Sequence, residues 1–297
     1  MERTKPPKAK LPAIKAPKEK KFAIQVLNIK LLSNDRSGSD AYADILTSIF
    51  NDKIIKPVKG GKQAILRTQF KTEIKGKTVI YGKFSKFTKI EGEGWLNLNN
   101  MEVQSLEIPK HLFPNLVESD YIFIPDAHRL AIIKTDKIQI SSVYTFFLQA
   151  VKDVIASDED FQVIIEQSSD IFDEIINAPH IYRLEIDISY SNHDIYKEAS
   201  EFMDDEIRSM NAKKLKLIVT PDHRQQLSLN SEILKGALGV AKSNGEVKAL
   251  IKDSHSHRKT IITKDHPETL PLKAANEDQI KSTIFDKIMN MFRNDNQ

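Results

Sequence analysis

Two neighbouring segments, residues 63–74 and 78–90, are joined by Lys75-Gly76-Lys77 and constrain the fold more than any other feature of the chain. Each segment alternates apolar and polar residues, which is the pattern of a half-buried strand. A short glycine-containing turn between two such segments is typical of an antiparallel hairpin. The alternation predicts that the first strand carries charges on one face and largely apolar residues on the other, namely Arg67, Lys71 and Lys75 against Leu66, Thr68, Phe70 and Ile74.

Further strands and helices follow one another along the rest of the chain. Period-two patterns predict strands at residues 22–31, 121–125, 129–134, 161–166, 182–189, 214–219, 247–251 and 260–263. Apolar residues spaced three and four apart predict helices at residues 39–50, 141–155, 170–176, 194–210, 231–243 and 276–292. Because hairpins are mixed with strand–helix units, we expect an α+β fold rather than a doubly wound sheet or a barrel.

The length of 297 residues predicts two domains, since a single core stops growing near this size. We expect a disordered basic arm at residues 1–21 and an N-terminal α+β domain of antiparallel hairpins and helices at residues 22–156. A C-terminal α+β domain of mixed strands and helices should follow at residues 157–297 and end in an amphipathic helix. The boundary is placed at the acidic residues 157–160.

Positive charge is concentrated in two segments, although the formal net charge is only +3. Residues 1–21 hold eight basic and two acidic side chains, and residues 53–89 hold eleven basic side chains against Glu73 alone. The remainder of the chain is therefore acidic. Such segregation creates a local field that attracts polyanions. We expect the basic arm either to bind phosphate groups or only to keep the chain soluble.

Cysteine is absent, and no apolar run approaches the roughly 20 residues that a membrane-spanning helix needs. The first residues are polar and contain proline, which is unlike a secretory signal. We therefore expect a cytoplasmic protein without membrane insertion. The absence of cysteine also excludes thiolate metal sites and cysteine nucleophiles.

The basic hairpin predicts contact with nucleic acid. Lysine and arginine neutralise phosphates, and aromatic rings stack on the bases of single strands. The residues expected to make these contacts are Arg67, Lys71, Lys75, Lys77, Tyr81, Lys83, Lys86 and Phe87. The alternative is a solvated edge that lysines keep soluble. Trp95, the single tryptophan, is expected to anchor a core.

A metal-dependent nuclease is a competing hypothesis. Such a site needs one carboxylate on one strand and a carboxylate-x-lysine pattern on the next, so that two acids hold a cation and the lysine steadies the attacked phosphate. Asp222 followed by Glu246 and Lys248 matches this pattern, but a predicted helix separates the two parts. We therefore favour a non-catalytic protein with no metal site and no cofactor.

The histidines are better explained as loop residues than as metal ligands. His255, His257 and His266 lie near one another, but none has the i, i+4 spacing of a helical metal site. We expect His128 and His180 to be isolated surface residues, although His128 and Arg129 together would also suit a phosphate. There is no glycine-rich phosphate loop, nucleophile elbow or HExxH motif, which argues against common NTPases and hydrolases.

Five stretches of this chain resemble an uncharacterised bacterial domain family. They are residues 22–29 (FAIQVLNI), 81–95 (YGKFSKFTKIEGEGW), 184–188 (LEIDI), 237–249 (ALGVAKSNGEVKA) and 263–267 (TKDHP). The family has no established catalytic residues, so the resemblance implies a lineage and no reaction.

More remotely, the layout resembles the phage-exclusion protein RexA and the KwaB subunit of the Kiwa anti-phage system. The shared pattern is an alternating strand at residues 184–189, a polar helix, further strands and a His-Pro turn. This resemblance implies DNA binding and self-association.

We therefore expect a nucleic-acid-binding effector of anti-phage defence or phage exclusion, with DNA favoured over RNA as its partner. The acidic C-terminal part would serve homo-oligomer formation or recruit a basic protein. A third hypothesis is a protein-interaction module or sensor whose basic surface meets an acidic partner.

Overall fold

The computed structural model describes residues 19–33, 35–90, 94–105, 107, 109, 111–189, 198–223 and 225–294. The predicted basic arm lies outside these ranges except for residues 19–21, and Lys20 and Lys21 open the first strand. Six α-helices and fourteen strands are formed by the described residues, so the predicted α+β class is confirmed. None of the helices in this part of the chain is both long and apolar enough to cross a bilayer.

The predicted helices and strands are found close to their expected positions. The helices are α1 (Gly38–Asn51), α2 (Ile140–Val154), α3 (Ser169–Ile176), α4 (Glu198–Ser209), α5 (Glu232–Asn244) and α6 (Glu277–Asn294), with 3-10 turns η1 (Pro125–Ala127) and η2 (Thr263–Asp265). The strands are β1 (Lys20–Leu32), β2 (Lys56–Val58), β3 (Lys62–Ile74), β4 (Lys77–Thr88), β5 (Gly94–Asn97), β6 (Glu102–Ser105), β7 (Val117–Ile124), β8 (Arg129–Ile133), β9 (Asp160–Ile165), β10 (His180–Ile188), β11 (Leu215–Val219), β12 (Gly245–Lys252), β13 (Arg258–Ile262) and β14 (Leu270–Ala274).

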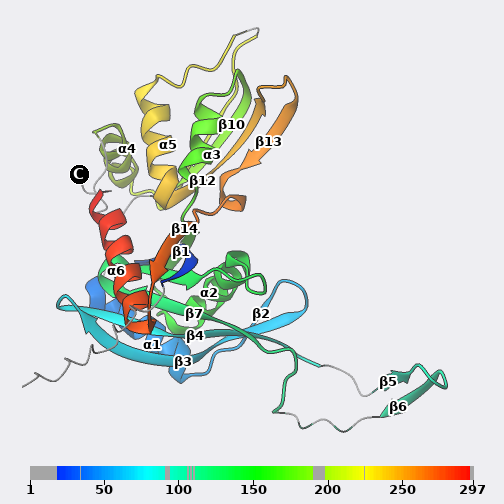
Figure 1. The fold of residues 1–297 in the computed structure, drawn as a ribbon. Coiled ribbons are helices and arrows are strands. Elements are labelled where there is room, and N and C mark those ends of the chain that lie inside the picture. The colour runs from blue at the N-terminus through cyan, green and yellow to red at the C-terminus, as the bar shows by residue number, and fades with distance from the viewer. Residues whose placement is uncertain are drawn as a thin grey trace, which may run out of the picture.

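A large antiparallel sheet forms the lower body of the molecule in Figure 1, in the order β14-β1-β8-β7-β4-β3-β2. Alternate residues of β1 enter two different cores. Leu27 and Ile29 face α1 and α2, whereas Ile24 and Val26 face α6. Burial on both faces explains why both alternating sets of β1 contain apolar residues, Ile24 and Val26 on one face and Leu27 and Ile29 on the other.

A small sheet, in the order β11-β10-β12-β13, forms the upper lobe in Figure 1. Helices α3, α4 and α5 bury one face of this sheet against Leu184, Ile186 and Ile188 of β10. The alternate residues of β10, such as Arg183 and Glu185, lie on the opposite face and form ion pairs there. This is the one-sided burial that period-two alternation predicts.

The small sheet is an insertion within the large one. One edge of β1 pairs with β14 along Lys20–Ile24 and with β9 along Leu27–Leu32. The chain leaves through β9, builds the upper lobe with residues 169–265, and returns through β14. The two connections form a neck, in which Ser168 N donates to His266 O at 2.9 Å and Glu268 N donates to Glu166 O at 2.8 Å.

The route of the chain between the two sheets differs from the predicted domain boundary between residues 156 and 157. Strands β9 and β14 belong to the large sheet, and α6 packs against the large sheet through Ile284, Phe285 and Ile288. The predicted last helix therefore exists, but it covers the N-terminal sheet. The C-terminal half of the chain is thus shared between the two sheets.

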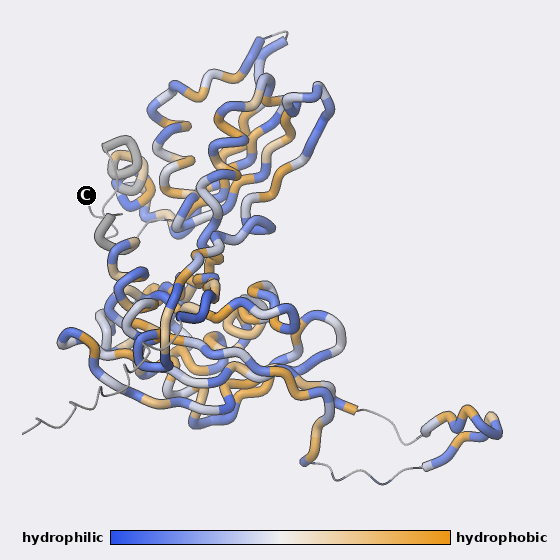
Figure 2. The backbone as a smooth tube through the Cα atoms, viewed as in Figure 1, coloured by the Kyte–Doolittle hydropathy of each residue, from blue (hydrophilic) through white to orange (hydrophobic). Residues whose placement is uncertain are grey.

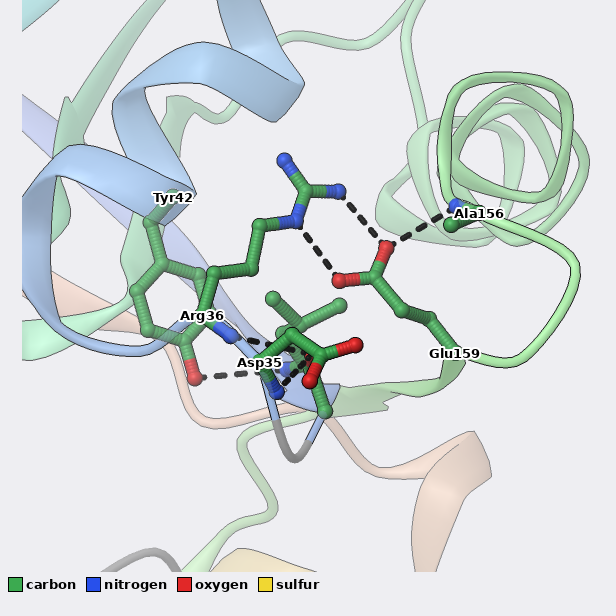
Figure 3. A network of polar contacts seen from close by, with 7 residues as sticks. Asp35, Arg36, Tyr42, Ala156 and Glu159 are labelled. Atoms are coloured by element: carbon green, nitrogen blue, oxygen red, sulfur yellow. Dashed lines mark hydrogen bonds and ion pairs between the residues drawn. The ribbon is translucent and has the colours of Figure 1, made fainter.

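A polar clamp joins the loop before α1 to the loop before β9 (Figure 3). Arg36 donates from Nε to Glu159 Oε1 at 2.6 Å and from Nη2 to Oε2 at 2.7 Å, and Ala156 N donates to the same carboxylate at 2.9 Å. Only 4% of the Glu159 side chain is exposed. The hydrogen bond from Arg36 is the main reason that the pKa of Glu159 is lowered to about 2.

Strands β5 and β6 form a separate hairpin that projects from the body (Figures 1 and 2). Trp95 lies on this hairpin and is 37% exposed, so the expectation that it anchors a core is wrong. Leu96 pairs directly with Val103, and both side chains are exposed, as are Leu98 and Met101. Within the part of the chain that the structure describes, no other element covers this apolar face of the hairpin.

Candidate nucleic-acid interface

The basic hairpin is present as strands β3 and β4, and its turn has the predicted chemistry. Lys75 and Gly76 both adopt positive φ angles, 51° and 74°, which is the conformation of a two-residue type I′ turn. The strands pair from Lys62 and Thr88 at the open end to Ile74 and Lys77 at the turn. The hairpin is therefore a long ribbon with two distinct ends.

The predicted grouping of charges on one face is wrong, because a bulge at Arg67 interrupts the alternation. The register shifts between Leu66 and Thr68. Lys71 then pairs with Ile80, whose side chain lies in the core beneath α1, whereas Arg67 contacts Glu118 on the α6 side of the sheet. A bulge places an extra residue in one strand and re-aims the side chains that follow it.

Between the bulge and the turn, all basic side chains except the exposed Lys71, which forms no ion pair within the described residues, are paired with carboxylates from other parts of the chain. Lys83 Nζ lies 2.6 Å from Asp120 of β7, Lys77 Nζ lies 2.8 Å from Asp126 of η1, and Lys75 Nζ lies 2.6 Å from Asp286 of α6. Three of the predicted phosphate contacts are thus internally neutralised. A phosphate would have to compete with these carboxylates.

Arg67 is neutralised in the same way by Glu118 of β7. Burial opposes the ionisation of Glu118, but hydrogen bonds from Arg67 and Ser85 outweigh it and hold the pKa of Glu118 below its ordinary value. The carboxylate is therefore charged at neutral pH and cancels the charge of Arg67.

At the open end of the hairpin, Lys59, Lys62 and Lys86 have a different environment. Lys62 donates a hydrogen bond to Thr88, and within the described residues no carboxylate forms an ion pair with any of these three lysines. Burial, followed by the nearby charge of Lys62, lowers the pKa of Lys86. The contribution of Lys62 to this lowering indicates that the two ammonium groups lie near each other.

The predicted stacking residues are less accessible than expected. Phe87 is only 6% exposed and packs against Phe113, with the ring centroids 4.9 Å apart. Tyr81 lies between Phe70 and the ammonium group of Lys281, which is 4.5 Å from the centre of its ring. At the open end, Phe113 is the more exposed ring, at 39%.

The three residues of the nuclease hypothesis are not brought together. Strand β10 lies between β11 and β12, and adjacent strands are about 4.8 Å apart. Asp222 follows the end of β11 toward the start of β10, whereas Glu246 opens β12 beside the end of β10. Glu246 is instead paired with Lys264, at 2.7 Å, and Lys248 lies farther along β12. Elsewhere in the described ranges, no three histidine and carboxylate side chains form a potential metal site.

The histidines singled out from the sequence have different environments. His255 and His257 lie in the exposed β12–β13 turn, where their backbone amides donate to Asp253. His128, in contrast, is buried, so the expectation of a surface residue is wrong. Its Nδ1 lies 2.9 Å from Asn28 Oδ1. Burial is the largest cause that lowers the pKa of His128 well below its ordinary value.

Arg129, the neighbour of His128, is also buried. Its Nε lies 2.6 Å from Glu166 Oε1 at the start of the neck. The pair therefore supports the junction between the sheets and offers no phosphate contact at the surface.

Residues 20–290 match a family model described as a domain of unknown function (DUF4747). The chain belongs to the DUF4747 family. The match begins at β1 and ends within α6, so a single DUF4747 unit includes both the large sheet and the inserted lobe. The expectation of an uncharacterised domain family is thereby confirmed. No curated protein matches this DUF4747 chain.

Proposed function

We propose that this DUF4747 protein binds nucleic acid without catalysis through the open end of the β3–β4 hairpin. The observation that carries this proposal is the uncompensated cluster of Lys59, Lys62 and Lys86, in contrast to the paired basic residues near the turn. Ammonium groups without carboxylate partners have no ion pair to break when they approach a phosphate, and counterion release favours the complex.

Phe113 lies at the same end and offers a partly exposed ring for stacking on an unpaired base. Phosphate contacts of this kind carry no sequence information, so binding should depend weakly on sequence and strongly on salt. The remote resemblance to RexA and KwaB supports DNA as the partner and a role in anti-phage defence or phage exclusion.

The test is fluorescence anisotropy of labelled single-stranded DNA, double-stranded DNA and RNA, measured across a salt series. The test variant is Lys62→Gln/Lys86→Gln, and the matched control is Lys77→Gln/Lys83→Gln, which removes two charges from the same hairpin at positions that have carboxylate partners. Loss of two phosphate contacts should lower the slope of log K against log salt by about 1.4 to 1.8 for the test variant. The control variant should keep the wild-type slope.

Equal losses in both variants would contradict the proposal, because the site would then not be confined to the open end. Magnesium-dependent shortening of the substrate would restore the nuclease hypothesis. Binding that does not change with salt would exclude phosphate neutralisation as the source of affinity.

The projecting β5–β6 hairpin favours a second proposal, self-association. A two-stranded hairpin is only marginally stable alone in water, and both of its edges are unpaired among the described residues. Two copies related by a two-fold axis would pack these apolar faces against each other and cover Leu96 and Val103. Analytical ultracentrifugation of Leu96→Ser/Val103→Ser should show loss of a dimer, and a wild-type monomer at high concentration would exclude this proposal.

A further inference from the structure

The small sheet of the inserted lobe, the upper lobe in Figure 1, is covered by helices on one face only. On its outer face, residues of three adjacent strands lie directly opposite one another, because Arg183 of β10 pairs with Leu250 of β12, and Leu250 pairs with Thr260 of β13. Together with Glu185 and Lys248, these residues line a hollow of about 410 Å³. The outer face is therefore an open surface that a ligand can reach.

Three basic side chains of the outer face, Lys248, Lys252 and Arg258, form no ion pair with any carboxylate of the described residues. Lys248 and Lys252 alternate along β12, and Arg258 of β13 lies opposite Lys252, so period two places all three on the same face. A phosphate that approaches these side chains has no ion pair to break.

The other charges of the outer face are paired. Arg183 and Lys216 share the single carboxylate of Glu185, which leaves one positive charge in excess. Nearer the neck, each lysine has a carboxylate of its own, Lys214 with Asp187 and Lys264 with Glu246. The unpaired positive charge is thus concentrated toward the β12–β13 turn, at the end of the sheet away from the neck.

A group of planar side chains lies at the same end of the sheet. Tyr182 is the extra residue of a bulge in β10, a feature that re-aims side chains and is common beside functional sites. The rings of His180 and Tyr182 are 4.5 Å apart, and Arg258 Cζ lies 4.4 Å from the centre of the Tyr182 ring. Because Arg258 is exposed, its guanidinium group is backed by Tyr182 and offers its other plane to a base.

The dimensions of the outer face suit a short stretch of single strand. Four strands at a spacing of about 4.8 Å span about 14 Å, which is enough for two or three nucleotides. Leu250, between Lys248 and Lys252 on β12, and Ile218, which is 53% exposed on β11, add apolar surface for sugars and bases. The face thus combines cations, a stacking plane and apolar contacts.

We propose that the outer face of the inserted lobe binds single-stranded nucleic acid. Lys248 and Lys252 neutralise phosphates, and an unpaired base stacks on Arg258. A duplex keeps its bases stacked inside the helix, so this face should select single strands. The surface lies on the inserted lobe, away from the open end of the β3–β4 hairpin, and goes beyond the proposed function because it does not depend on that end.

The experiment is fluorescence anisotropy of the full chain with labelled single strands of DNA and RNA, about 8 nucleotides long, and with duplex DNA, across a salt series. It is performed in the wild type and in the Lys62→Gln/Lys86→Gln variant, so that binding at the open end of the hairpin is separated from binding at the lobe. Single strands should still bind when the open end is mutated. The stronger of the DNA and RNA complexes identifies the class of strand.

The test variant is Lys248→Gln/Lys252→Gln. In either background it should lower the slope of log K against log salt for single strands by about 1.4 and leave duplex binding unchanged. The matched control is Lys235→Gln/Lys242→Gln, which removes two exposed lysines from α5 on the opposite side of the same lobe. These lysines also form no ion pair within the described residues, and the control should bind single strands as the parent does.

Tyr182→Leu tests the stacking plane. Loss of the ring that backs Arg258 should raise the Kd for single strands about tenfold and leave the salt slope unchanged. A second measurement locates the strand directly. A single strand that carries a photoreactive thio-substituted base is crosslinked to the wild type, and mass spectrometry should find it attached to β10, β12 or β13.

The proposal is overturned if crosslinks occur only outside the inserted lobe, or if the α5 control lowers the slope as much as the test variant does. Competition by an acidic peptide that is as effective as a single strand would assign the face to a protein partner instead. A loss of duplex binding in Lys62→Gln/Lys86→Gln alone concerns only the open end, so the two proposals can fail independently. Circular dichroism of each variant checks that it is folded.

Discussion

Replacement of Glu159 by glutamine should destabilise the protein at neutral pH, because Arg36 loses its bidentate partner. The side chain keeps its size, and only the charge is removed. A pKa lowered from the ordinary 4.5 to about 2 corresponds to about 3 kcal/mol at 1.36 kcal/mol per unit. Solvent weakens the ion pair, because 35% of the Arg36 side chain is exposed. We therefore expect the free energy of unfolding to fall by about 2 kcal/mol.

The effect of pH follows from the direction of the shift. A carboxyl group with a lowered pKa in the folded state stabilises the protein fully above its unfolded pKa, near 4.5, and the contribution is lost as pH falls through about 2. The difference between wild type and Glu159→Gln should therefore be largest at pH 7 and shrink steadily between pH 4.5 and pH 2.

Urea unfolding followed by circular dichroism at several pH values measures this difference. Asp278→Asn is the control, because Asp278 is 92% exposed and its ion pair with Lys281 should contribute little. A loss in Glu159→Gln that is the same at pH 7 and at pH 2.5 would refute the electrostatic reasoning and assign the effect to packing.

Two further predictions concern the large sheet. Gly82→Ala should lower the melting temperature strongly, because the Cβ of the alanine would lie 1.9 Å from the carbonyl oxygen of Thr68. An unchanged melting temperature would show that the two strands can move apart at the bulge. His128 is neutral and buried when folded, so protonation of the unfolded chain should destabilise the protein as pH falls below about 6.5. The His128→Asn variant, whose asparagine tolerates the positive φ at this position, should show a weaker dependence of the free energy of unfolding on pH in this range. An unchanged pH dependence would exclude His128 as its source.

All six helices and ten of the fourteen strands of the described residues could be predicted because their signals are local, whereas the short strands β2, β5, β6 and β14 were not predicted. The β3–β4 turn, the helical periods of α2 and α6, and the alternation of β10 all lie within short windows of sequence. The division between the two sheets could not be predicted in this way. It depends on β9 and β14 sharing one edge of β1, and these pairings join residues that are far apart in the sequence.

The sequence of β7 contained a signal that the basic residues of the hairpin have acidic partners. Glu118 and Asp120 stand two residues apart on β7 and lie opposite Ser85 and Lys83 of β4, so period two places both acids on one face. That alternation could have indicated that the basic segment is partly neutralised from within. The bulge at Arg67 has no comparable signal, since no glycine or proline marks it.

The neck determines how firmly the inserted lobe is held against the large sheet. The inserted lobe is held by two adjacent strands, and its further contacts with the large sheet include Asn28 Nδ2 to Ser243 O at 3.1 Å and Ser189 Oγ to Gln162 Oε1 at 2.5 Å. Units joined by few polar contacts change their relative orientation more readily than units that share a large apolar interface. We therefore expect backbone hydrogen exchange at Glu166, Gln167 and Ser168 to be faster than exchange in the paired residues of β3 and β4. Equal protection in the two regions would show that the neck opens no more readily than the hairpin.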